Sequence, residues 1–290
     1  MQSRTFALHL AMTPGIGGKS VIRILTRNSL LGRSPEEFLS LSPEAYREEY
    51  RLSMKAVAGL NERTIAETAE LEKRLGSLGV TLATAADAHY PSCIEEMDPD
   101  PPGVLFMYGN TRLLESKTFT VMSSRDSRPA DLEMVERLTE EGVLNSEILV
   151  SGHDRPEYQR AAIVPLRWGS PRILCLDRGL FKVLGEDLKN EAFRTARLWR
   201  YQFDPMTDLV ITPFRPDAKF VGINNKLRDR LIGCLSQRLT FVRISEGGNM
   251  DQIARMALRA GRKVAVTDRS ETYLRYRAEG AEIIKEYTEA

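Results

Sequence analysis

Small and basic residues follow the strands that this sequence predicts in its second half, and together they could hold a phosphate. Five such segments are Ser123-Ser124-Arg125, Ser151 to Arg155, Asp177-Arg178-Gly179, Pro213-Phe214-Arg215 and Ser245 to Asn249. Four of the five contain an arginine. Arginine beside small residues and backbone N–H groups suits a phosphate better than an apolar ligand. The predicted anion site has four members from these segments: Ser124, Arg125, Gly152 and Arg155.

A basic segment begins at Asn224, where turn-forming residues precede three cations and an apolar helical face. The cations are Lys226, Arg228 and Arg230, followed by Leu231, Ile232 and Leu235. Cations at a helix start oppose the helix dipole, which costs roughly a few tenths of a kcal/mol unless an anion lies close by. We therefore predict that this segment is the floor of a phosphate groove. A solvated basic turn is the plainer alternative.

Two phenylalanines near these segments, Phe214 and Phe220, could stack on nucleobases. Stacking on an aromatic ring gives single strands an affinity that tolerates any base sequence, about 1–3 kcal/mol per base. Packing of each ring in the core or in a loop is the alternative.

A glycine-rich turn lies between two apolar helical stretches near the N-terminus, at Thr13 to Ser20. Pro-Gly-x-Gly at such a place is typical of a helix-hairpin-helix motif, in which backbone N–H groups can hold a phosphate. Gly15, Gly17 and Lys19 are therefore candidate backbone contacts. A plain helix–helix turn is the alternative, because Gly-Pro pairs occur in many loops.

Patterns typical of catalysis or metal binding are missing from the sequence. It has no Gly-x-Ser-x-Gly elbow, no His-Glu-x-x-His pair and no Walker-type loop, and no Gly-x-Gly-x-x-Gly follows the first strand of the α/β region. Asp154, Asp177 and Glu246 could act as bases, although capping and ion pairing are commoner roles. We predict no catalytic residue, no metal and no cofactor.

The composition is that of an ordinary folded protein of 290 residues, with 42% hydrophobic and 28% charged residues. The net charge is +1, so a nucleic-acid site must come from local clustering of cations. No apolar run approaches the roughly 18 residues of a membrane span, and no signal peptide is recognisable. Cys93, Cys175 and Cys234 are odd in number and widely spaced, which favours a reducing compartment. The sequence predicts a cytoplasmic protein with no membrane partner.

The order of the predicted elements indicates a helical domain over residues 1–78 and an α/β domain over residues 79–290. Strands are expected at 80–82 and 104–108, then at 119–122, 148–150, 173–176, 209–211, 239–244 and 263–266. Helices are expected between and after the later strands, at 130–141, 157–166, 187–201, 227–235, 250–259 and 271–278, and residues 282–287 could form a last strand. Such alternation is typical of a doubly wound parallel sheet, which binds ligands beyond the carboxyl ends of its strands.

Taken in order along the chain, these motifs resemble those of one family, the DNA-processing protein A (DprA, also called Smf) family. The similarity runs from about Leu8 to Asp268. The matching stretches are Thr13 to Gly17, Tyr90-Pro91 to Gly109-Asn110, Ser123-Ser124-Arg125, Ser151-Gly152 with Arg155, Arg228 to Ser236, and Ala257 to Val266.

The resemblance implies an extended Rossmann-like fold, preceded by a small helix-hairpin-helix or SAM-like domain, and a homodimer. It also implies binding of single-stranded DNA and loading of the RecA recombinase during DNA recombination, in uptake (natural transformation) or repair of foreign DNA. The expected partners are therefore single-stranded DNA, RecA and a second copy of the chain.

The chain departs from the family pattern at several of the expected DNA contacts. The family's Arg-Gly-Ile-Asp is Arg155-Pro156-Glu157-Tyr158 here, so a glycine that would let the backbone approach a phosphate is lost. The family's Gly-Ser-Arg is Ser123-Ser124-Arg125, and the aromatic-Pro pair before Arg-x-Arg is Asn225-Lys226. We therefore expect a divergent member.

Two other kinds of function stay open. Nucleoside-monophosphate phosphoribohydrolases and related Rossmann-like nucleotide sensors carry Pro-Gly-Gly-x-Gly-Thr-x-x-Glu, and Glu246 to Gln252 keeps two of its glycines but neither its Thr nor its last Glu. A protein-interaction module with a decayed DNA site would fit the near-neutral charge and the lost glycines.

Overall fold

The computed structural model describes residues 3–60, 64–125 and 127–285, and the chain falls into two compact units. The first unit contains Met1–Tyr90, Pro99–Met107 and Pro213–Arg215. The second contains Pro91–Asp98, Tyr108–Thr212 and Pro216–Ala290. The domain boundary expected at residue 78 stays a prediction.

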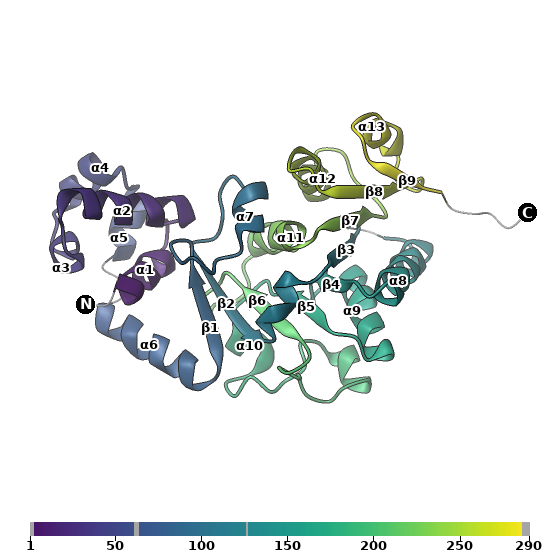
Figure 1. Cartoon of the computed structure of the whole chain (residues 1–290), viewed down its shortest axis with the longest axis horizontal. Coiled ribbons are helices and arrows are strands. Elements are labelled where there is room, and N and C mark those ends of the chain that lie inside the picture. Colours follow the sequence, from purple (N-terminus) through teal and green to yellow (C-terminus); the bar gives the residue numbers. More distant parts are fainter. Residues whose placement is uncertain (1–2, 61–63, 126, 286–290) are drawn as a thin grey trace, which may run out of the picture. The chain divides into compact units, whose positions relative to one another are not determined.

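The first unit is built mainly from short helices, at the purple end of the chain in Figure 1. They are α1 (Ser3–Met12), α2 (Gly18–Leu31), α3 (Pro35–Leu39), α4 (Pro43–Tyr50), α5 (Met54–Leu60) and α6 (Ile65–Ser77). Strand β1 (Val80–Thr84) follows, and β2 (Val104–Gly109) begins in this unit. The predicted helical N-terminal region is confirmed.

Polar side chains determine where three of these helices begin. The Ser34 hydroxyl accepts a hydrogen bond from the Glu37 N–H and the Glu37 carboxylate accepts one from the Ser34 N–H, which makes a capping box before α3. Thr64 and Glu67 make the same arrangement before α6. Ser42 caps α4 by accepting from a backbone N–H. Each cap typically contributes about 1 kcal/mol.

Phe38 is the centre of the aromatic core of the first unit. Its ring centroid lies 5.5 Å from that of Phe6, 5.1 Å from that of Tyr46 and 4.9 Å from that of Tyr50, all edge to face. This geometry brings the positive ring edge to the negative ring face and is favoured over face-to-face stacking. The buried Tyr50 hydroxyl donates to Asn28 Oδ1 at 2.5 Å, so its polar end is satisfied.

The glycine-rich turn between α1 and α2 is packed within its own unit. Gly15 has a φ of +86°, and a Cβ there would lie 3.0 Å from the Ala56 nitrogen. The Gly18 N–H donates to the Pro101 carbonyl at 3.2 Å. Lys19, in the first turn of α2, is exposed.

The second unit is organised around a parallel β-sheet (Figure 1). Its strands are β3 (Thr118–Met122), β4 (Ile148–Ser151), β5 (Arg172–Cys175), β6 (Leu209–Thr212), β7 (Arg238–Phe241), β8 (Lys263–Thr267) and β9 (Glu282–Ile284). They lie in the order β6-β5-β4-β3-β7-β8-β9, and every adjacent pair is parallel. From β3 the chain moves to one side through β6 and then returns to the other side of β3 with β7. This reversal confirms the predicted α/β class and the doubly wound, mostly parallel sheet.

Helices cover both faces of this sheet. The longer ones are α8 (Pro129–Leu144), α9 (Pro156–Trp168), α11 (Asn224–Leu235) and α12 (Asn249–Arg259). The shorter ones are α7 (Ser92–Met97), η1 (Thr111–Glu115), α10 (Leu180–Leu184), η2 (Arg194–Leu198) and α13 (Tyr273–Ala278). Right-handed crossovers in opposite directions along a sheet place their helices on opposite faces. Accordingly, α8 packs with α9 on one face, and α11 packs with α12 on the other (Figure 1).

The central strands are buried on both sides because helices cover both faces. Phe119 and Val121 of β3 pack with Leu149 of β4 and Val135 of α8 in one buried cluster. Gly142 of α8 leaves room for the Phe119 ring, since a Cβ at Gly142 would fall 2.3 Å from that ring. The core of the sheet is therefore closely packed against α8.

One predicted helix is wrong. Residues 187–201 contain only the short 3₁₀ helix η2. Leu188 has a φ of +59°, outside the helical region, and the buried Glu191 carboxylate accepts a hydrogen bond from Arg172 Nη2 at 2.5 Å. Tertiary ion pairing overrides a favourable local helix propensity here.

The predicted last strand is confirmed over Glu282–Ile284 as β9, while residues 286 and 287 lie outside the described residues. No helix in the described part of the chain has the length and apolarity that a bilayer crossing requires. Over the same residues, no group of three or more His, Cys, Asp and Glu side chains could hold a metal ion.

Candidate anion-binding site

A pocket of about 290 Å³ lies where the sheet reverses its strand order. Its lining comes from the loops after β3, β4 and β7, from the first two turns of α11 and from the start of α12: Ser124, Arg125, Arg155, Asn225, Lys226, Asp229, Ser245, Gly248, Asn249 and Met250. Doubly wound sheets bind ligands at this point because the loops of adjacent strands diverge there. The structure thus brings four predicted site residues into one pocket: Ser124, Arg125, Arg155 and Lys226.

Two cations of the pocket, Arg125 and Lys226, are exposed and have no ion-pair partner among the described residues. Arg155 is different, because its Nη2 lies 3.4 Å from a Glu157 carboxylate oxygen and 3.3 Å from the Ser123 carbonyl. The pocket therefore carries a positive charge that comes mainly from Arg125 and Lys226.

Two helix N-termini add to this positive potential. Asn225 and Lys226 belong to the first turn of α11, and Asn249 and Met250 to the first turn of α12. The first N–H groups of a helix have no partner within it, so they attract anions. Gly247 has a φ of +68°, which allows the turn into α12.

Behind the pocket lining, Arg228 of α11 is the centre of a layer of buried charges that includes Asp154 and Asp229. Arg228 is fully buried. Its guanidinium donates to Asp154, to Asp229 Oδ1 at 2.7 Å and to Asn225 Oδ1 at 3.2 Å. It also lies over the Tyr158 ring, 4.6 Å from the centroid. Arg228 is thus surrounded by its own partners, and the structure gives it a positioning role.

Asp229 lines the pocket and connects it to the buried charges around Arg228. Its two oxygens accept hydrogen bonds from the Tyr158 hydroxyl and from Asn249 Nδ2, both at 2.7 Å. Burial, and then the neighbouring Asp229 charge, raise the pKa of Tyr158 well above its ordinary value, so the phenol stays neutral. Although burial opposes the charged form of Arg228, the polar and acidic groups around it raise its pKa. Both carboxylate oxygens of Asp229 are therefore engaged in contacts that hold α9, α11 and α12 together.

Gly152 is needed where the β4 loop passes over this layer. A Cβ at Gly152 would lie 2.7 Å from the Tyr158 ring and 3.0 Å from Arg228 Nη1. Both neighbours are fully buried, so neither can move away cheaply. Gly152 therefore shapes the site from behind and does not line it.

Ser124 ties the two loops at the reversal point together. Its hydroxyl accepts a hydrogen bond from the Ser245 N–H at 2.8 Å, and its own N–H donates to the Arg243 carbonyl at 2.9 Å. These bonds hold Arg125, the next residue, at the mouth of the pocket.

A buried acid, Asp177, anchors the loop after β5. It accepts hydrogen bonds from Arg178 Nε at 2.7 Å and from His153 Nε2 at 3.2 Å. Burial opposes its ionisation, but the bonds from His153 and Arg178 outweigh burial and lower the Asp177 pKa. Its carbonyl also accepts from Asn224 Nδ2 at 2.8 Å, which joins this loop to the start of α11.

Other predicted site residues are not part of the pocket lining. Arg230 forms an ion pair with Asp98. Phe220 is 42% exposed, and the Arg178 guanidinium lies over its ring, 5.2 Å from the centroid. Phe214 belongs to the first unit and is half-buried.

The remaining predicted contacts, Gly15, Gly17 and Lys19, also belong to the first unit. Their contact with a phosphate stays a prediction.

Two residues that support the pocket, Tyr158 and Asp229, were not predicted from the sequence. The sequence holds a weak signal for Asp229, because it is an acidic residue between two arginines, Arg228 and Arg230, of a basic segment. Tyr158 carried no such signal, since its contact with Asp229 joins residues 71 apart in sequence.

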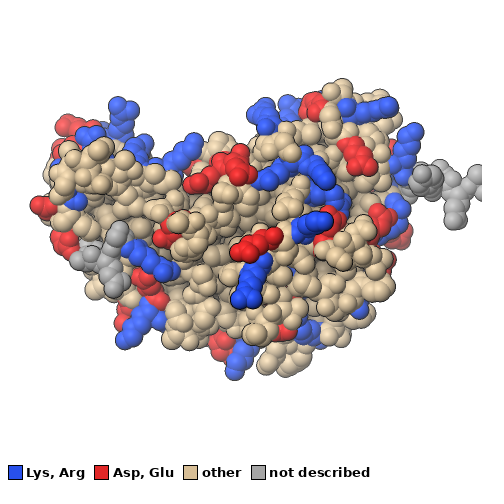
Figure 2. All heavy atoms as spheres, in the orientation of Figure 1, with Lys and Arg blue, Asp and Glu red and all other residues tan. Residues whose placement is uncertain are grey.

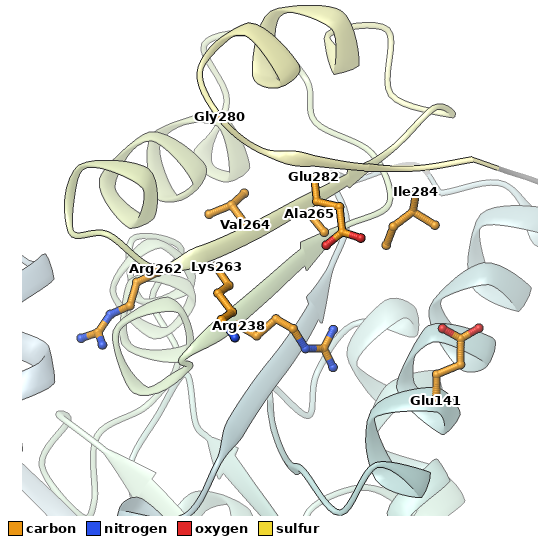
Figure 3. A pocket seen from close by; sticks show the side chains of 9 residues that line it. All are labelled: Glu141, Arg238, Arg262, Lys263, Val264, Ala265, Gly280, Glu282 and Ile284. Carbon is orange, nitrogen blue, oxygen red and sulfur yellow. The ribbon is translucent and has the colours of Figure 1, made fainter.

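Cations also gather at the opposite edge of the sheet. Figure 2 shows Lys and Arg side chains concentrated over the region that α11, α12, β7 and β8 occupy in Figure 1, with Asp and Glu among them. A hollow of about 440 Å³ lies there. Figure 3 shows the side chains that line it, among them Arg238 and Lys263 from the amino ends of β7 and β8, with Glu141 and Glu282. Arg238 is paired with Glu147. The mixed charge of this hollow makes it a poorer anion site than the pocket at the carboxyl ends.

Comparisons with known proteins agree with this architecture. Residues 81–289 match the model of a family described as DNA recombination-mediator protein A. The structure is similar to that of DNA processing protein A from Streptococcus pneumoniae, with a TM-score of 0.74, 18% sequence identity, and coverage of 98% of this chain and 95% of that one. It is also similar to DNA processing protein A from Helicobacter pylori, with a TM-score of 0.53, 16% identity, and coverage of 71% of this chain and 90% of that one. No curated protein matches the sequence.

Proposed function

Because the chain belongs to the DNA recombination-mediator protein A family, we propose that its pocket binds the phosphates of single-stranded DNA during recombination. The observation that carries the proposal is the meeting of Arg125 and Lys226, both without an ion-pair partner among the described residues, with the N-termini of α11 and α12. The work on the Helicobacter pylori protein describes a single-stranded DNA binding mode, which supports this choice of ligand.

We infer that the site binds its ligand and does not transform it. The carboxylate in the pocket lining, Asp229, is held by Tyr158, Arg228 and Asn249. An acid in that position cannot act as a base without losing the contacts that join three helices. Phosphate contact through Arg125 and Lys226 needs no such change.

We further propose that the bound strand is passed to a RecA-type recombinase and that the protein acts as a homodimer. The family's description as a recombination mediator supports the first point. The resemblance of the chain's motifs to the DprA family supports both. An assay of RecA filament formation on single-stranded DNA would test the transfer, with stimulation expected from the wild type and lost when pocket binding is lost.

Binding of a labelled oligothymidylate, followed by fluorescence anisotropy at low salt, tests the pocket itself. Arg125→Ala/Lys226→Ala should weaken binding at least tenfold, because a hydrogen bond to a charged group contributes roughly 1.5–3 kcal/mol. The matched control is Arg259→Ala/Arg277→Ala, which removes two exposed cations from α12 and α13. Equal affinities for both double variants would refute the pocket as the DNA site.

A further inference from the structure

An exposed aromatic surface lies at the edge of the second unit opposite the anion pocket. Trp168 ends α9 and Trp199 follows η2, and each is 51% exposed. Leu198 and Tyr201 are 83% and 79% exposed. We call these four residues, together with Arg194 and Arg197, the tryptophan patch. Apolar side chains this large are normally buried, so their exposure at one place points to a ligand.

The position of the patch follows from strand direction. The segment that carries it is anchored at Arg172 and Asp208, which lie at the amino ends of β5 and β6. The anion pocket lies at the carboxyl ends of the same sheet. Each four-residue strand spans about 13 Å, so the patch and the pocket are separate sites.

The patch is basic as well as aromatic. Residues 192–203 contain three arginines and no aspartate or glutamate. Arg194 and Arg197 are exposed, and the described residues offer them no ion-pair partner. They are three positions apart on a 3₁₀ helix, which places them on the same side of it. Next to them, the Arg167 guanidinium lies 5.5 Å from the Trp199 ring centroid and is paired with Glu136. The Trp168 Nε1–H donates to a Glu140 carboxylate oxygen at 3.0 Å, so the unpaired positive charge of the patch comes from Arg194 and Arg197.

A buried charge network holds this segment in place. Arg172 is fully buried and donates to Glu191 at 2.5 Å, to Asp208 at 2.8 Å and to the Ala162 carbonyl at 2.8 Å. Arg200 closes the network by pairing with Glu191 and Asp208. Because Arg200 points inward and is fixed, the flanking Trp199 and Tyr201 remain at the surface. A surface that is ordered before binding loses less entropy when a ligand binds.

We propose that the tryptophan patch is a second contact for single-stranded DNA, in which Trp199 and Tyr201 stack on bases and Arg194 and Arg197 contact phosphates. Aromatic side chains interleaved with cations are the arrangement that binds unpaired nucleotides without regard to sequence. Glu136 and Glu140 of α8 border the patch at Arg167 and Trp168, but residues 192–203 carry no acidic side chain beside Arg194 and Arg197, which favours a polyanion over a protein partner of mixed charge. This inference rests on the proposed function, but DNA binding by the patch can be measured separately in a variant whose pocket is disabled.

Tryptophan fluorescence reports on this surface directly, because the chain has two tryptophans and both lie in the patch. The full-length Arg125→Ala/Lys226→Ala variant, whose pocket is disabled, is titrated with an oligothymidylate at low salt. We expect saturable quenching that salt reverses. Adding Arg194→Ala/Arg197→Ala should weaken it at least tenfold, because two charged contacts to phosphates are lost. Adding Arg259→Ala/Arg277→Ala instead should have a smaller effect.

The other outcomes separate this inference from the proposed function. Anisotropy that detects DNA binding by the wild type without any tryptophan quenching would overturn the patch and leave the pocket standing. Quenching that is equal in both quadruple variants would also overturn it. A tryptophan signal that changes with protein concentration and not with DNA would assign the patch to a second copy of the chain. Trp199→Phe, which keeps a ring of the same kind, should retain most of the anisotropy-detected affinity, whereas Trp199→Ala should not.

Discussion

At the scale of the residue, the predicted site cations have different roles. Arg228 is buried among Asp154, Asp229 and Tyr158 and holds helices in place. Arg125 and Lys226 have no such partners in the described structure and can bind a ligand. Exchanging Arg228 for a smaller residue would therefore impair folding before it revealed anything about binding.

Gly152→Ala should destabilise the protein by about 1–3 kcal/mol, because the added methyl group would overlap the buried Tyr158 ring and approach Arg228. Urea unfolding measures this loss. Gly222→Ala is the matched control, since a Cβ at Gly222 meets nothing within 4 Å, and it should change stability by less than about 0.5 kcal/mol. Equal effects of the two substitutions would contradict the packing described for the β4 loop.

Asp177 should make the stability of the protein depend on acid pH. Its pKa is lower in the folded protein than its ordinary value, so its ionisation stabilises the fold above about pH 4 and that contribution is lost as pH falls. Urea unfolding should show that Asp177→Asn is less stable than the wild type near neutral pH and that the gap narrows on acidification. Glu133→Gln, at an exposed position of α8, should leave the pH profile unchanged. A gap that stays constant with pH would rule out this role.

At the scale of the element, the alternation of strands and helices was predictable because buried parallel strands and amphipathic helices leave strong patterns in the sequence. The convergence of Ser124, Arg125, Arg155 and Lys226 was predictable for the same reason, since the carboxyl ends of parallel strands share one edge. Their contact with DNA stays a prediction.

Burial of individual charges was not predictable from the sequence. Arg228 looked like a surface cation because its partner Asp154 is 74 positions away. The predicted helix over 187–201 failed for a related reason. Its residues favour a helix locally, but Glu191 is drawn to Arg172, a contact that sequence periodicity does not record.

The buried network that displaces this helix should be among the most costly to break. Arg172→Ala removes the buried partner of Asp208 and Glu191 and leaves them only the partly exposed Arg200, so we expect a loss of about 3–5 kcal/mol in urea unfolding. Arg194→Ala removes an exposed arginine from the same segment and should change stability by less than about 0.5 kcal/mol. A small effect of Arg172→Ala would mean that the segment is held by other contacts.

At the scale of the whole molecule, a net charge of +1 gives no general attraction for nucleic acid. Affinity must therefore come from a few cations placed together, and the second unit has such a group at the reversal point of its sheet. A protein of this kind should bind DNA in a way that depends strongly on particular residues.

The salt dependence of oligothymidylate binding tests this central claim most directly. Each neutralised phosphate of a single strand contributes roughly −0.7 to the slope of log affinity against log salt concentration. Arg125→Ala/Lys226→Ala should therefore flatten the wild-type slope by about 1.4, if each cation neutralises one phosphate. Arg259→Ala/Arg277→Ala should leave the slope close to that of the wild type. Tight binding whose slope is the same in all three proteins would contradict the account.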